Sequence, residues 1–293
     1  MGIVGLEALR RNNFEIVAVF SHEDDPDENR WFPSVGDWAK KQGIPLYLPP
    51  QVNTPLWYER ILSLKPEVIF SFYYRKLLKR EILQLPPLGA FNLHGSYLPY
   101  YRGRCPVNWV IINGERETGV TLHRMVEEPD AGDIVGQRRV PIDFYDTAFS
   151  LYKKLCCEAA SLLDEFLPLI KEGRIVTRPQ DLEKGSYYGG RRPEDGRIDW
   201  QKSALSIYNL IRAVTHPYPG AFTFLGGEKV MVWWAYPEEE DIPAEAGTVL
   251  VEKGMAYVAT GSGRIRLAEI EIAGKRLIGE EIGQFFKEKG SLS

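Results

Sequence analysis

The chain has 293 residues, of which 44% are hydrophobic, with a formal net charge of −4 and an isoelectric point near 5.8. This length leaves room for two domains, and the acidic balance offers no overall basic surface for nucleic acid. The sequence shows neither an apolar run of about 18 residues nor a signal-like start, so we expect neither membrane insertion nor export.

The three cysteines are Cys105, Cys156 and Cys157. An odd number cannot form a complete set of disulfides, two of them are adjacent, and none stands in a metal-ligand spacing. We therefore expect a reduced, cytoplasmic protein that holds no metal ion.

The beginning of the chain lacks an expected element. Residues 2–9 resemble a glycine-rich turn entering a helix, but no strand precedes them, as one would in a doubly wound sheet. Either the first strand lies upstream of Met1 or the sheet lacks that strand, and we expect a truncated sequence. The strands predicted at 16–20 and 68–72 should then have unpaired flanks.

Apolar runs alternate with helical patterns over residues 1–180. The runs at 16–20 and 68–72 are typical of strands covered on both faces. Between them, Thr54-Pro55 predicts a helix start, because a capping residue precedes a proline. Further on, the patterns predict a helix over 106–113, a strand over 118–124 and a long amphipathic helix from 146 or 147 to 172. This alternation predicts an α/β fold with a Rossmann-like, mostly parallel sheet.

The remainder of the chain has a different character. Residues 181–202 are polar and rich in glycine, which indicates a linker or a loop that returns to the site. Residues 203–293 begin with a predicted helix over 203–214. Short strands punctuated by glycine follow and predict a small OB-like β-barrel; they are expected at 230–234, 247–251, 255–260 and 265–272.

The chemistry is expected at the end of the strand that begins at Phe91. Side chains two apart share a face of a strand, so Asn92 and His94 should point away from the core that Phe91 and Leu93 enter. An amide, an imidazole and the more distant carboxylate of Asp130 form a proton-transfer set. The sequence leaves open whether the carboxylate orients the imidazole, stabilises its charged form or relays the proton.

Other polar residues have simpler interpretations. Ser96 follows glycine but has no G-x-S-x-G elbow, so we expect it to shape the loop rather than act as a nucleophile. The remaining histidines, His22, His123 and His216, stand in no ligand spacing. We expect His123 to be a strand residue with a satisfied hydrogen bond.

Four motifs in the same order resemble the folate-dependent formyltransferases over nearly the whole chain. Within that family they are similar to the formyltransferase domain of the bifunctional polymyxin-resistance enzyme, which acts on UDP-4-amino-4-deoxy-L-arabinose. The motifs are IFSFYYRKLL (69–78), FNLHGSYLPYYRGRCPVNW (91–109), ETGVTLHRMVEEPDAG (117–132) and GRRPED (190–195).

The resemblance implies formyl transfer from 10-formyltetrahydrofolate to the amine of a nucleotide-linked sugar, a reaction of lipid A and lipopolysaccharide biosynthesis. It implies Asn92, His94 and Asp130 as catalytic residues. The other residues expected at the site are Tyr73, Tyr74, Arg75, Lys76 and Leu77 for the folate, and Arg102, Arg104, Arg191 and Arg192 for the acceptor. In the relative, a decarboxylase domain continues the chain. Here we expect a stand-alone enzyme, a homo-oligomer or a separate decarboxylase partner.

Two alternative functions can be weighed against features of the sequence. A methionyl-tRNA formyltransferase shares the catalytic strand but needs basic contacts to RNA. Residues 21–29 instead carry five acidic side chains, which disfavours tRNA. A non-catalytic folate- or nucleotide-binding module is disfavoured by the intact Asn92, His94 and Asp130.

Overall fold

The computed structural model describes residues 1–23 and 29–289. They form two compact units. The first comprises Met1–Pro106, Glu117–Pro141 and Tyr152–Gly189, and the second comprises Val107–Arg116, Ile142–Leu151 and the chain from Gly190 onward. In the described part of the chain, no helix is both long and apolar enough to cross a membrane.

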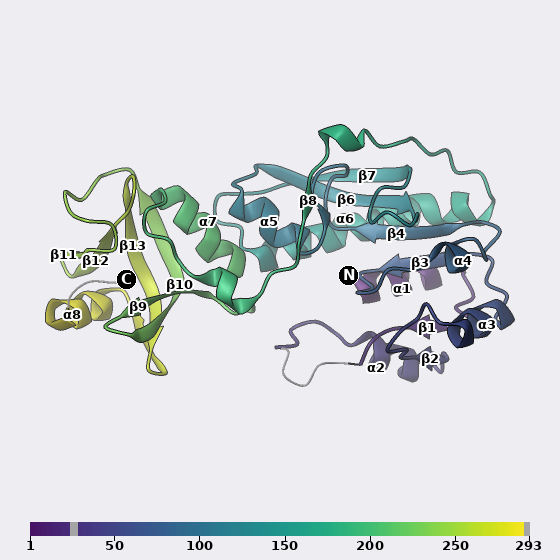
Figure 1. The fold of residues 1–293 in the computed structure, drawn as a ribbon, viewed down its shortest axis with the longest axis horizontal. Coiled ribbons are helices and arrows are strands. Elements are labelled where there is room, and N and C mark those ends of the chain that lie inside the picture. The colour runs from purple at the N-terminus through teal and green to yellow at the C-terminus, as the bar shows by residue number, and fades with distance from the viewer. Residues whose placement is uncertain (24–28, 290–293) are drawn as a thin grey trace. The chain divides into compact units, whose positions relative to one another are not determined.

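The first unit contains short parallel pairs and one larger sheet (Figure 1). Its helices are α1 (Gly2–Arg11), α2 (Val35–Lys41), α3 (Pro55–Ser63), α4 (Arg80–Leu83), η1 (Leu182–Lys184) and most of α6 (Ala148–Lys171). Its strands are β1 (Val19–Phe20), β2 (Leu46–Tyr47), β3 (Ile69–Phe72), β4 (Ala90–His94), β5 (Arg102–Gly103), β6 (Glu117–Arg124), β7 (Ile134–Pro141) and β8 (Tyr187–Tyr188).

The larger sheet has the strand order β3-β4-β6-β7. β3 and β4 run parallel, whereas β4–β6 and β6–β7 are antiparallel. The α/β class is therefore confirmed, and the sheet is mixed rather than mostly parallel. The connection between β6 and β7 is too short for the crossover that a parallel pair needs, so these strands form a hairpin.

Helix ends follow the local signals in the sequence. Pro55 is the first residue of α3, after Thr54, and the Ser203 hydroxyl accepts the Ser206 N–H at the start of α7 (Ala204–Val214). Gly173, with φ +67°, follows α6. α6 packs against β7, where a side chain at Gly136 would overlap the ring of Phe166.

The expected unpaired flanks of the first strands are present. Within the described residues, β1 pairs only with β2 and β3 only with β4. The predicted strand at 16–20 is shortened to Val19–Phe20, because only these two residues pair with β2. A largely apolar cavity of about 230 Å³ is lined by residues 14–22 and 68–74, among others.

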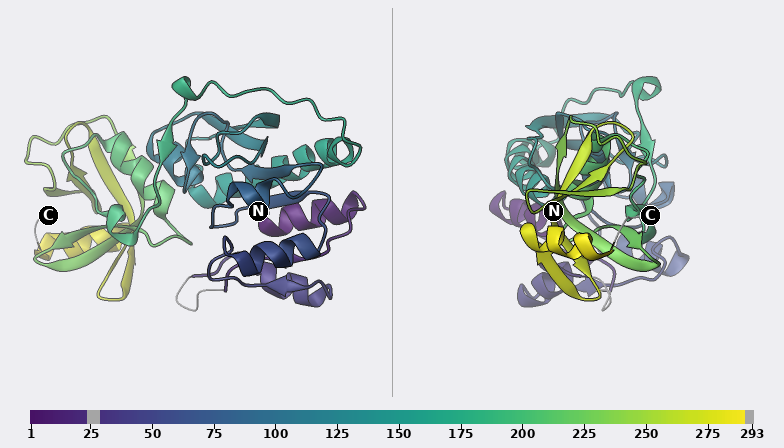
Figure 2. Two further views of the ribbon diagram at one scale, coloured as in Figure 1. Left: turned by 45° about the vertical axis from the view of Figure 1, so that its right-hand side comes forward. Right: turned by 90° about the vertical axis from the view of Figure 1, so that its left-hand side faces the viewer.

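The second unit is built on an antiparallel sheet (Figure 2). Its strands are β9 (Ala221–Leu225), β10 (Glu228–Glu238), β11 (Val249–Glu252), β12 (Met255–Ala259), β13 (Arg264–Ile272) and β14 (Lys275–Ile278), and its helices are α5 (Pro106–Ile112), α7, η2 (Pro193–Gly196) and α8 (Glu280–Lys289). The strand order is β11-β12-β13-β10-β9, with β14 on β13. The expected C-terminal β domain is confirmed. Its edge strands β9 and β11 do not pair among the described residues, so the sheet is open and the expected closure into a barrel is not observed.

Candidate active site

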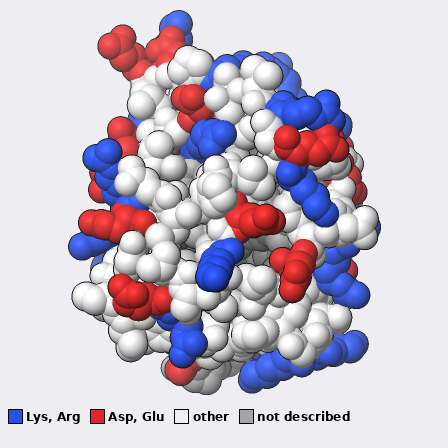
Figure 3. Space-filling model, turned by 90° about the vertical axis from the view of Figure 1, so that its right-hand side faces the viewer, with Lys and Arg blue, Asp and Glu red and all other residues white. Residues whose placement is uncertain are grey.

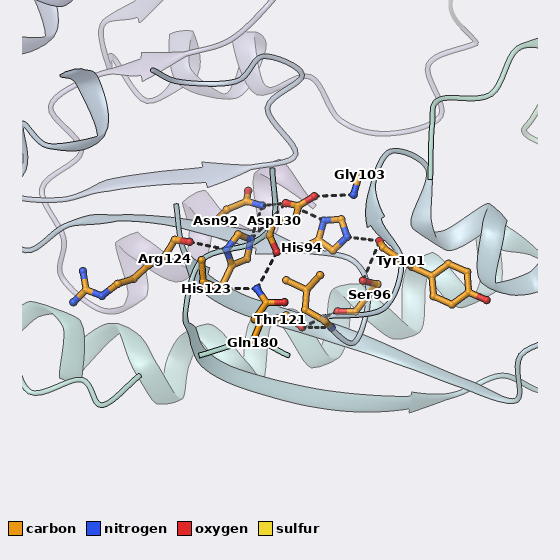
Figure 4. Close-up of polar contacts among 12 residues, drawn as sticks. Asn92, His94, Ser96, Tyr101, Gly103, Thr121, His123, Arg124, Asp130 and Gln180 are labelled. Atoms are coloured by element: carbon orange, nitrogen blue, oxygen red, sulfur yellow. Dashed lines mark hydrogen bonds and ion pairs between the residues drawn. The ribbon is translucent and has the colours of Figure 1, made fainter. Parts of the chain in front are cut away.

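β4 presents the two predicted polar residues on one face. Phe91 and Leu93 are fully buried on the other face, as the alternation predicted. β6 lies beside β4 in antiparallel register, with Asn92 opposite His123. β4 ends at His94, so the site lies where the chain leaves the sheet (Figure 4).

Asp130 reaches this strand end from the loop after β6. One carboxylate oxygen, Oδ2, accepts the Gly103 backbone N–H at 2.9 Å. The other, Oδ1, accepts an N–H of the Asn92 amide at 3.2 Å and lies 3.6 Å from His94 Nδ1. The structure therefore brings the three predicted catalytic residues together.

The hydrogen bonds of His94 decide which ring nitrogen can move a proton. Its Nε2 lies 2.8 Å from the Tyr101 carbonyl oxygen, which can only accept, so Nε2 carries a hydrogen. In the neutral ring, Nδ1 then has the lone pair, and this atom faces Asp130. Nδ1 is therefore the ring nitrogen that is able to accept a proton, and once protonated it would face a carboxylate.

Burial sets the charges of this pair. Burial lowers the pKa of His94, and the neighbouring Asp130 carboxylate opposes that shift. Burial alone would raise the pKa of Asp130, but His94 and the Gly103 N–H together hold it well below its usual range. Near neutral pH the site therefore combines a neutral imidazole base with a carboxylate anion.

Backbone strain is concentrated around the site. Among the described residues, eight non-glycine residues have positive φ, and four of them flank the site: Tyr73, Tyr101, Cys105 and Asp130. Left-handed backbone costs free energy in non-glycine residues and gathers where function requires it. At Tyr101 and Asp130 this geometry delivers the carbonyl and the carboxylate that contact His94.

Side chains outside the catalytic set support these loops. The Ser96 hydroxyl donates to the Tyr100 carbonyl at 2.6 Å and is fully buried, which agrees with its expected role in shaping the loop. Gln180 donates its amide N–H groups to the carbonyls of Asp130 and Gly132 at 2.8 and 2.6 Å. The Ser96 and Gln180 hydrogen bonds therefore hold the backbone of the loops that carry Tyr101 and Asp130.

The predicted folate segment, Tyr73 to Leu77, begins where β3 ends, next to the catalytic strand. Any side chain at Gly95 would overlap the Tyr73 hydroxyl, so glycine permits this close approach. Lys76 donates to the carbonyls of Pro49 and Pro50. Arg75 and Leu77 are exposed, while the hydroxyl of Tyr74 is buried and burial raises its pKa.

The four arginines predicted to contact the acceptor belong to different units. Arg102 and Arg104 lie in the first unit, where Arg102 donates to Glu128 at 3.2 Å and Arg104 is exposed. Arg191 and Arg192 belong to the second unit. There, the Arg191 guanidinium lies 4.7 Å from the ring centre of Trp109, in a cavity of about 510 Å³ that Arg197 and Lys202 also line.

Some features of the site were missed or lie outside the described residues. His123 was expected to be a strand residue with a satisfied hydrogen bond, and it is one, in β6. Its place in the site, the Gly103 N–H and the Tyr101 carbonyl were not predicted; only the strand alternation around His123 offered a signal. Residues 24–28 of the acidic segment lie outside the described residues. Among described side chains, no group of three or more His, Cys, Asp or Glu is placed to hold a metal ion.

The chain was compared with known protein families and solved structures. The formyl transferase family model matches residues 4–167, and the model of the formyl transferase C-terminal domain matches residues 191–288.

Three solved structures illustrate the likeness in fold. The N-formyltransferase of Helicobacter canadensis, in complex with folinic acid and dTDP-3-aminofucose, is 22% identical with a TM-score of 0.71, over 91% of this chain and 95% of that one. The sugar 3N-formyltransferase WlaRD, with dTDP and 5-N-formyl-THF, is 22% identical with a TM-score of 0.69, over 93% and 94%. HypX of Aquifex aeolicus with tetrahydrofolic acid is 22% identical with a TM-score of 0.59, over 85% of this chain but 44% of HypX.

Together, the two family models match residues in both units, and the chain belongs to the formyl transferase family.

Proposed function

We propose that this formyltransferase moves a formyl group from 10-formyltetrahydrofolate to the amine of a nucleotide-linked amino sugar, with UDP-4-amino-4-deoxy-L-arabinose as the favoured acceptor. The observation that carries the proposal is the position of His94 at the end of β4: its Nε2–H meets the Tyr101 carbonyl, and its Nδ1 lies 3.6 Å from Asp130 Oδ1. Folate ligands in the related structures support the choice of donor. The product would belong to lipid A and lipopolysaccharide biosynthesis.

His94 would act as the proton carrier. As the acceptor amine attacks the formyl carbon, the new carbon–nitrogen bond forms and Nδ1 takes the proton from the attacking nitrogen. The imidazolium is then stabilised by Asp130 beside it. Nδ1 returns the proton to the folate nitrogen as the bond from that nitrogen to the formyl carbon breaks, which leaves a formamide and tetrahydrofolate.

Asn92 would supply the donor for the developing oxyanion, through the N–H that Asp130 Oδ1 accepts in this structure. A donor already in place stabilises the transition state without reorganisation, and removing one typically costs a hundredfold or more in kcat. The neutral His94 ring has its only N–H on the Tyr101 carbonyl, so it contributes a donor only after Nδ1 is protonated.

The folate and acceptor residues remain those expected from the sequence. Tyr73 to Leu77 would contact the folate, and the place of Tyr73 beside Gly95 supports this. Arg102, Arg104, Arg191 and Arg192 would contact the acceptor, since guanidinium groups match phosphate oxygens. In support, Arg191 lines a cavity of about 510 Å³ in the second unit together with Arg197 and Lys202.

The five acidic residues in the sequence segment 21–29 favour a sugar nucleotide over methionyl-tRNA. Figure 3 shows one face of the molecule, on which Lys and Arg alternate with Asp and Glu rather than forming a continuous basic surface. A tRNA acceptor needs several cationic contacts to phosphates.

The test is a transfer assay with 10-formyltetrahydrofolate and a panel of acceptors: UDP-4-amino-4-deoxy-L-arabinose, dTDP-3-aminofucose and methionyl-tRNA. We expect formamide on a sugar nucleotide and a loss of at least a hundredfold in kcat for His94→Ala, with acceptor binding retained. Faster formylation of methionyl-tRNA would replace the proposed acceptor. Binding of donor and acceptors without any transfer would establish a non-catalytic module.

A further inference from the structure

His123 is buried in the middle of the site, although the mechanism above does not use it. It stands opposite Asn92 in the β4–β6 register, and it is 2% exposed. Its Nδ1 lies 2.7 Å from the Arg124 carbonyl oxygen, and its Nε2 lies 3.1 Å from the Asn92 amide nitrogen and 3.5 Å from Asp130 Oδ1 (Figure 4).

These contacts determine the tautomer of His123. A carbonyl oxygen only accepts hydrogen bonds, so Nδ1 carries the hydrogen. In the neutral ring Nε2 then has the lone pair, and it accepts one N–H of the Asn92 amide. The ring therefore acts as an acceptor toward Asn92.

The same contacts fix the orientation of the Asn92 amide. One N–H points to His123 Nε2 and the other to Asp130 Oδ1. The reversed amide would place its oxygen against the Asp130 carboxylate and lose both hydrogen bonds. His123 thus holds the NH2 group on the side of Asp130 and His94.

We propose that His123 is a positioning residue for formyl transfer. As a neutral Nδ1–H imidazole, it orients the Asn92 amide and, through it, the Asp130 carboxylate that faces His94 Nδ1. It contacts neither donor nor acceptor and acts through these residues. The inference rests on the proposed catalytic roles of Asn92 and His94, but the tautomer can be tested without any substrate.

Two variants separate the acceptor function from packing. His123→Phe keeps a planar ring but removes the acceptor, and we expect kcat to fall by about a hundredfold, as misplaced catalytic groups do, with KM values within a few-fold. His123→Gln can place an amide oxygen near the position of Nε2, and we expect it to recover most of the lost kcat. His216→Phe is the matched control, because His216 stacks on Trp233 in the second unit, and its kcat should not change.

A spectroscopic measurement tests the proposal on the unmodified protein. The chain has four histidines, so ¹⁵N labelling of histidine gives an assignable spectrum. We expect a protonated Nδ1 and an unprotonated Nε2 for His123, and the opposite tautomer for His94.

Each result has a definite meaning. An Nε2–H tautomer of His123, or a His123→Phe variant with kcat within twofold of the parent, overturns the proposal. Loss of kcat in both His123 variants alike also overturns it, since packing would then explain the effect. If the parent formylates no amino sugar, the proposed function fails, whereas the spectrum still decides the tautomer.

Discussion

Replacing Asp130 by asparagine removes one charge from the site with little change in size. In the structure the carboxylate lies 3.6 Å from His94 Nδ1. At an effective dielectric constant of about 20, unit charges at this separation attract each other by about 4.6 kcal/mol. That attraction develops only when Nδ1 takes the proton, so its loss acts mainly on the transition state and should lower kcat by up to about 2,000-fold.

The pH profile of Asp130→Asn gives a second, independent signal. His94 must be neutral to accept a proton, so kcat rises with pH through the pKa of His94. Burial lowers this pKa and the Asp130 carboxylate opposes the shift, so the pKa falls further when the charge is removed. The rise in kcat should therefore move to lower pH in the variant, while the plateau drops.

The effect on stability has a defined sign. The pKa of Asp130 is held low in the folded protein, so its carboxylate stabilises the fold at pH values above its unfolded pKa. The stability difference between parent and Asp130→Asn should be fully present at neutral pH. It should shrink as the pH falls through the folded pKa of Asp130.

The assay is steady-state formyl transfer from pH 5 to 9 with both substrates saturating, together with urea unfolding. Asp133→Asn is the matched control, since this carboxylate accepts from Thr177 instead of facing His94. The reasoning is refuted if Asp130→Asn keeps kcat within tenfold of the parent. It is also refuted if the rise in kcat stays in place or moves to higher pH.

Three further substitutions test other parts of the molecule. Gly95→Ala should displace the Tyr73 hydroxyl and raise the KM of the folate donor several-fold with little change in unfolding free energy; an unchanged donor KM would argue against a folate contact there. Arg192→Ala should mainly raise the acceptor KM, which initial rates at varied acceptor will show, and a loss confined to kcat would contradict a diphosphate contact. Gly283→Ala should cost about 1–3 kcal/mol of unfolding free energy in urea titrations, because the added carbon meets the Gly254 carbonyl, and backbone cannot rotate away.

Much of the fold follows from local patterns. The burial of Phe91 and Leu93 confirms the strand alternation, and the starts of α3 and α7 follow their capping residues. Strand pairing was harder to predict. β6 and β7 run antiparallel because of a short connection, and the first strand consists of only Val19–Phe20 because its partner β2 is equally short. Such features depend on the neighbouring strands rather than on the strand itself.

The amino-acid sequence by itself determined which chemical groups the site contains and where the catalytic strand ends. Side-chain alternation is a local property, and it placed Asn92 and His94 on one face of that strand. Only the tertiary structure decided how the groups are used. The antiparallel register brings His123 to Asn92 from 31 positions away, and a left-handed turn at Tyr101 presents the carbonyl that leaves His94 Nδ1 as the proton acceptor. Hydrogen-bond partners assign tautomers and amide orientations, and these partners come from segments distant in the chain.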